Sequence, residues 1–85
     1  MKRIVCSIQP FVMKQMVMVY NEEGKLDKTI PSTIGNLPTT IWEACKTNHI
    51  DNVDLAGSRI FTGRVQKELI KISKFAKIDL TINIH

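Results

Sequence analysis

The last eight residues constrain the fold most, because their pattern allows only one side of a strand to be buried. From Ile78 to His85, an isoleucine or leucine occupies every second position and a polar side chain follows each one. This alternation indicates a strand with one face on a core and the other in solvent. A parallel strand covered by helices on both faces would be apolar throughout. The chain is therefore expected to place its helices on one face of a sheet.

The same reasoning along the chain predicts seven elements. Strands are expected over residues 3–9, 13–21, 25–30, 52–56 and 78–85, and helices over 37–48 and 59–76. Pro10 and Pro31 are expected to end the first and third strands, because proline cannot donate to a ladder. Pro38 fits a first helical turn, although a capping box at Thr40 leaves a later start open. Ser58 is the expected N-cap of the second helix.

Assigning the strand faces gives an expected core and an expected open face. In the second strand, Met16 and Met18 are expected in the core, while Val17 and Val19 are expected on the open face beside Val5. Valines on an otherwise polar face are compatible with a monomer and also with an interface. Trp42 is expected at the core boundary of the first helix. Two cysteines, Cys6 and Cys45, are expected as reduced core residues, because no signal peptide precedes them.

The element order β-β-β-α-β-α-β predicts one small α/β domain over residues 1–85. Right-handed strand-helix-strand crossovers make part of the sheet parallel. We expect an α+β two-layer sandwich in which two helices cover one face of a five-stranded mixed sheet. This order resembles the minimal core of the ribonuclease H-like and actin-like folds. The resemblance is one of topology alone.

The resemblance implies a non-catalytic version of that fold. Active nucleases of this kind place carboxylates on the first strand, the first helix and the fourth strand. Glu43 and Asp54 match the last two positions, but the first strand has no acid, so the two-metal site is incomplete. The phosphate-binding turn of the actin-like branch is also missing from the first strand. With no Cys-x-x-Cys or His-x-x-x-His spacing, neither a cofactor nor a metal is expected.

The charge of the chain is concentrated in the second helix. Residues 59–77 hold six of the twelve Lys and Arg residues against one acid, Glu68, so this segment carries +5 in a chain of net charge +4. Four of these bases share one helix face and form what we call the basic stripe: Arg64, Lys67, Lys71 and Lys74. Each phosphate contacted by such a base releases counterions. A solvated face that keeps a small protein soluble is the alternative.

A second, weaker anion site is expected where the second helix begins, at Gly57, Ser58 and Arg59. Free N–H groups and the helix dipole favour anions there, but the spacing matches no known phosphate-binding loop. No Phe or Tyr is expected within the basic stripe, so contacts with a nucleic acid would be made to its backbone.

These features favour a small, non-enzymatic, cytoplasmic binding protein. Arg59 and the basic stripe would contact an acidic partner, either a nucleic-acid backbone or an acidic protein surface. No membrane partner is expected, and the small size suits a phage or mobile-element accessory factor. Two alternatives stay open: a homo-oligomer that pairs through the open sheet face or an edge strand, and a metal-dependent nuclease built on Glu43, Asp54 and Asp79.

Overall fold

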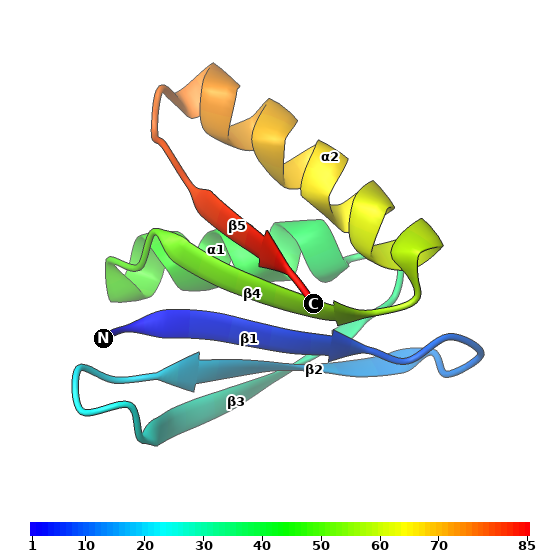
Figure 1. The fold of residues 1–85 in the computed structure, drawn as a ribbon, viewed down its shortest axis with the longest axis horizontal. Coiled ribbons are helices and arrows are strands. Elements are labelled where there is room, and N and C mark those ends of the chain that lie inside the picture. The colour runs from blue at the N-terminus through cyan, green and yellow to red at the C-terminus, as the bar shows by residue number, and fades with distance from the viewer.

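The computed structural model describes residues 1–85 and contains the seven expected elements in the expected order (Figure 1). The elements are β1 (Arg3–Ile8), β2 (Lys14–Tyr20), β3 (Leu26–Thr33), α1 (Leu37–Asn48), β4 (Asn52–Gly57), α2 (Arg59–Ala76) and β5 (Thr81–Ile84). The bounds of α2 are those predicted from the N-cap at Ser58 and from the apolar period that ends at Ala76.

The five strands form one mixed sheet in the order β3-β2-β1-β4-β5. The first three strands are antiparallel neighbours, whereas β4 is parallel to both β1 and β5. The central strand is β1, where Ile4 lies opposite Val19 of β2 on one side and Val53 of β4 on the other. The predicted mixed sheet is therefore confirmed.

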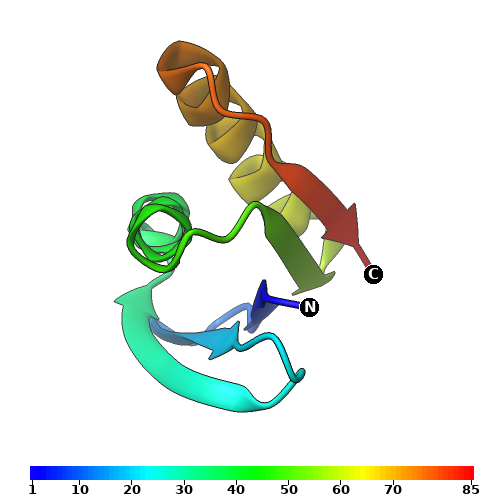
Figure 2. The same ribbon diagram turned by 90° about the vertical axis from the view of Figure 1, so that its left-hand side faces the viewer.

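Both helices pack against the same face of this curved sheet, which gives two layers (Figure 2). The core between the layers contains fifteen buried residues: Ile4, Cys6, Ile8, Val17, Val19, Leu37, Ile41, Trp42, Ala44, Cys45, Ile50, Val53, Leu55, Val65 and Leu69. The two cysteines are free thiols, and Trp42 is buried, in agreement with the sequence analysis. The opposite face of the sheet carries no helix.

The predicted orientation of β2 was wrong. Val17 and Val19 are buried against the helices, whereas Met16 and Met18 lie on the open face. The register decides this, because Val19 pairs with the buried Ile4 and must point to the same side.

Two strand boundaries also differ from the predictions. The third strand continues through Pro31 to Thr33, because β3 is an edge strand and a proline there removes no hydrogen bond from the sheet. The fifth strand begins only at Thr81, since Lys77 and Ile78 are used to end α2. Lys77 adopts a left-handed conformation, and the Ile78 N–H donates to the Ser73 carbonyl at 2.9 Å.

The starts of both helices follow the sequence signals. The first helix begins at Leu37 with Pro38 in its first turn, and Ser58 occupies the N-cap position of α2 in an extended conformation. Neither N-cap side chain makes a capping hydrogen bond. Neither helix combines the length and the hydrophobicity that crossing a membrane requires.

Candidate functional site

The predicted basic residues of α2 all reach solvent. Arg59, Arg64, Lys67, Lys71 and Lys74 are exposed, while Val65 and Leu69 of the same helix are buried against the sheet. Because the four residues of the basic stripe are spaced three, four and three apart, they follow the side of α2 that faces away from the core.

The basic stripe is almost free of neutralising acids. Its one ion pair joins Lys71 Nζ to Glu68 Oε1 at 3.7 Å, with both side chains more than half exposed. Such an exposed pair contributes little, because solvent screens it. Neither Arg64, Lys67 nor Lys74 has a carboxylate within 4.0 Å. The charge on α2 is therefore available to an external anion.

An aromatic side chain borders the basic stripe at its end, although none lies between its four bases. Phe75 is 94% exposed and follows Lys71 by four residues, so the two side chains lie on neighbouring turns of one side of α2. The sequence did contain a signal, because Phe75 falls outside the apolar spacing that runs from Phe61 to Ala76. A fully exposed phenylalanine beside lysines provides a stacking surface.

The glycine of the weaker anion site, at the start of α2, is explained by strand packing. Gly57 has φ 125°, and a Cβ at this position would lie 2.5 Å from the Ile8 carbonyl oxygen. Glycine is therefore required for the close approach of β4 to β1. Arg59 is exposed nearby, and the Ser58 carbonyl accepts the first helical hydrogen bond from the Thr62 N–H. No feature beyond the helix terminus itself indicates an anion here.

The open face of the sheet holds a polar cluster around Asp54. Its Oδ1 accepts a hydrogen bond from Asn83 Nδ2 at 2.9 Å and lies 3.6 Å from His85 Nε2. Its Oδ2 lies 3.7 Å from the Arg3 guanidinium, which stacks over the Tyr20 ring at 5.2 Å. The charges and hydrogen-bonding groups of this cluster pair with one another across four strands. We therefore interpret the cluster as structural.

The three carboxylates of the nuclease alternative are not brought together. Glu43 is exposed on α1, in the helical layer, and pairs with Lys46 at 3.2 Å. Asp54 is on the opposite face of the sheet, between the core residues Val53 and Leu55. Asp79 is exposed in the segment before β5. The structure contains no group of three His, Cys, Asp or Glu side chains placed to hold a metal ion.

The loop between β1 and β2 presents a second surface that the sequence analysis missed. We call Pro10–Met13 the hairpin tip. Its Phe11 is fully exposed at 101%, and Val12 and Met13 are also exposed. The predicted start of the second strand at residue 13 had placed part of this tip in the sheet.

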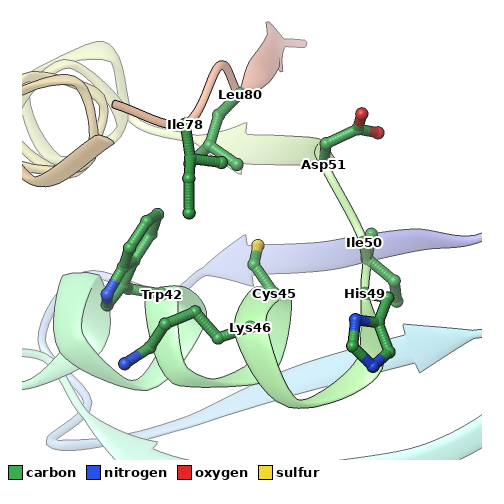
Figure 3. Close-up of a pocket in the computed structure, with 8 residues that line it drawn as sticks. All are labelled: Trp42, Cys45, Lys46, His49, Ile50, Asp51, Ile78 and Leu80. Atoms are coloured by element: carbon green, nitrogen blue, oxygen red, sulfur yellow. The ribbon is translucent and has the colours of Figure 1, made fainter. Parts of the chain in front are cut away.

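At the other end of the molecule, a cavity of about 330 Å³ opens between α1 and the segment that joins α2 to β5 (Figure 3). We call it the end cavity, and it is lined by Trp42, Cys45, Lys46, His49, Ile50, Asp51, Ile78 and Leu80. Figure 3 shows that Cys45 Sγ points from α1 toward the side of the cavity formed by Ile78 and Leu80. Burial, with a smaller effect of Asp51, raises the pKa of the Cys45 thiol to about 11. This thiol is protonated at neutral pH and acts as a core side chain rather than as a nucleophile.

Comparison with known proteins adds no assignment. The sequence matches no protein family model and no curated protein.

Proposed function

We propose that this protein binds polyanions through the basic stripe of α2, and that its partner is single-stranded nucleic acid. The supporting observation is that four bases share one exposed helix face, of which only Lys71 has a carboxylate neighbour. Ordinary exposed helices place acids three or four residues from bases, so that the charges pair. In α1, Glu43 and Lys46 form such a pair at i,i+3.

The dimensions of the stripe fit a short run of phosphates. Arg64 and Lys74 are ten residues apart, which corresponds to about 15 Å along the helix axis. Over that length the four side chains contact phosphates of the nucleic-acid backbone. Each contact releases counterions and adds to the salt dependence of binding. Since these side chains would contact phosphates and not base edges, the contacts carry no sequence preference.

Phe75 favours nucleic acid over an acidic protein surface, and an unpaired strand over a duplex. Its ring is 94% exposed at the end of the stripe. Stacking of an unpaired base on such a ring contributes about 1–3 kcal/mol. Bases inside a duplex are already stacked on one another, so this contribution is lost there. The alternative, a partner with an acidic protein surface, gives Phe75 no role of this kind.

The test is a titration against fluorescent single-stranded and double-stranded oligonucleotides at two salt concentrations. In the variant with Lys67→Glu and Lys71→Glu, we expect binding to be lost with an unchanged circular dichroism spectrum. The matched control is Lys25→Glu with Lys28→Glu, two exposed lysines, of which the first directly precedes β3 and the second lies within it. Both variants lower the net charge by the same amount, so a difference in affinity between them reports where the charges lie. We expect only the control to keep most of the affinity.

Phe75→Ser separates the two parts of the proposal. We expect it to reduce affinity for single strands by roughly 5- to 150-fold, which corresponds to a stacking contribution of about 1–3 kcal/mol, and to leave the salt dependence unchanged. Equal losses of binding in the stripe variant and in the β3 control would mean that overall charge, and not α2, attracts the nucleic acid.

The observed topology also supports the proposal that the fold is of the ribonuclease H-like kind. Its first strand, β1, carries no carboxylate, and Glu43 and Asp54 lie on different faces of the sheet. Within that proposal the chain is a binding version of the fold rather than a nuclease.

A further inference from the structure

The hairpin tip is apolar, exposed and held in one conformation by a buried side chain. Gln15 is only 2% exposed although it is polar. Its Oε1 accepts a hydrogen bond from the Gln9 N–H at 2.9 Å, and its Nε2 donates to the carbonyls of Gln9 at 2.8 Å and Val12 at 2.6 Å. The side chain of Gln15 thereby ties both ends of the tip to the sheet.

Phe11 adopts a strained backbone conformation that no interaction of its side chain within the molecule offsets. Its φ is 69°, in the left-handed region that residues other than glycine and asparagine rarely occupy. Its side chain is fully exposed, so no internal packing offsets this strain. Strained residues held by their surroundings are concentrated at binding sites. An exposed phenylalanine on a backbone held in this way is a feature for an external partner.

The end cavity has the size and chemistry to receive that side chain. Its volume of about 330 Å³ is at the lower limit for ligand pockets, so it suits one aromatic side chain better than a cofactor. Five of its eight lining residues are hydrophobic. Ile78 at its edge is 45% exposed, so an apolar surface is left uncovered there.

The hairpin tip and the end cavity lie at opposite ends of the strands. The tip follows the carboxyl end of β1, whereas Ile50 and Leu80 of the cavity precede the amino ends of the parallel strands β4 and β5. Figure 1 shows the tip at the right of the molecule and the loop before β4 at the left. Neither the tip nor the cavity includes a residue of the basic stripe.

We propose that the hairpin tip of one copy inserts Phe11 into the end cavity of a second copy. The charges beside the two surfaces agree with this, because Lys14 follows the tip and Asp51 lies at the cavity with no ion-pair partner of its own. Lys46 at the same cavity is already paired with Glu43 at 3.2 Å.

This contact joins two different surfaces, so each copy keeps one free tip and one free cavity after pairing. Such head-to-tail contacts continue into a chain of copies unless the rotation between copies closes a ring. The basic stripe of every copy stays outside the contact. The inference concerns self-association and does not rest on the proposed binding of nucleic acid.

The test uses two variants, each of which removes one half of the contact at an exposed position. Phe11→Asp removes the tip and keeps the cavity, and Ile78→Glu alters the cavity and keeps the tip. By sedimentation velocity without nucleic acid, we expect the wild type to form concentration-dependent species larger than a dimer. Each variant alone should be a monomer, and an equimolar mixture should form a heterodimer and nothing larger.

Ile60→Glu is the matched control, because Ile60 is 71% exposed on α2, outside both surfaces. It should assemble as the wild type does, and so should the variant with Lys67→Glu and Lys71→Glu. A wild type that stays monomeric at high concentration, or a mixture that forms no heterodimer, would overturn the proposal. Binding of monomeric wild type to phosphatidylcholine vesicles, abolished by Phe11→Asp, would overturn it as well and assign the tip to a lipid surface.

Discussion

The two helices cover the same sheet face but have different tasks. In α1, five of twelve residues are buried, and its one exposed acid and one exposed lysine neutralise each other at 3.2 Å. In α2, four of eighteen residues are buried, and five exposed bases face one acid. The comparison shows that α1 completes the core, whereas α2 uses a narrow buried stripe to support a charged surface.

Truncation of an isoleucine should show the largest difference between the buried side of α1 and the outer side of α2. Ile41 of α1 is 0% exposed, so Ile41→Ala is expected to lower the free energy of unfolding by about 2–5 kcal/mol. Ile70 of α2 is 38% exposed, and Ile70→Ala should cost about 1 kcal/mol or less. Urea unfolding followed by the fluorescence of the buried Trp42 measures both. Equal losses would mean that the Ile70 side chain is packed as tightly as that of Ile41.

The pH dependence of stability should report the buried thiol of α1. The pKa of Cys45 is raised from 9.0 to about 11, so the folded state keeps the proton that the unfolded state loses above pH 9. The stabilisation is complete below pH 9 and is lost as the pH rises through 11. At pH 10.5 the loss is about 2 kcal/mol for one such thiol.

Two variants check this assignment. Cys45→Ala should reduce the decline in unfolding free energy between pH 8.5 and 10.5. Gly63→Ala on α2 should leave the decline as it is, because it changes no ionisable group and its Cβ would meet no atom within 4 Å. A decline that is unchanged in Cys45→Ala would contradict a buried, protonated thiol.

The smallest expected effect concerns the glycine inside α2. Gly63 has a helical backbone, and a Cβ at this position would meet no atom within 4 Å. Gly63→Ala should therefore stabilise the protein by about 0.5–1 kcal/mol, chiefly by restricting the unfolded chain. Thermal unfolding measures this gain. A loss of stability would show that the outer side of α2 is more crowded than the structure indicates.

The order of elements and the bounds of α2 could be predicted because each depends on a local period. The orientation of β2 could not, since Met16 and Met18 are as apolar as Val17 and Val19. Gln15 alternates with these valines, and a polar residue in that position is typical of a solvent face. In the structure Gln15 is buried for another reason, which is to hold the hairpin tip.

The surfaces used in the two proposals differ in the same way. The basic stripe depends on helical spacing and charge, and both are visible in the sequence. The pairing of an exposed Phe11 with a distant cavity depends on a positive φ and on residues brought together from 42–51 and 78–80. No local pattern encodes either of these.

The central position of β1 determines the order in which this chain can fold. Its antiparallel neighbour β2 follows within a few residues, so the first hairpin can form early during synthesis. Its other neighbour, β4, joins Ile4 to Val53 across almost fifty residues, and this closure must wait until β3 and α1 are made. Until then one edge of β1 and its apolar face are uncovered. A nascent chain that pauses after β3 is thus expected to be the species most prone to aggregation.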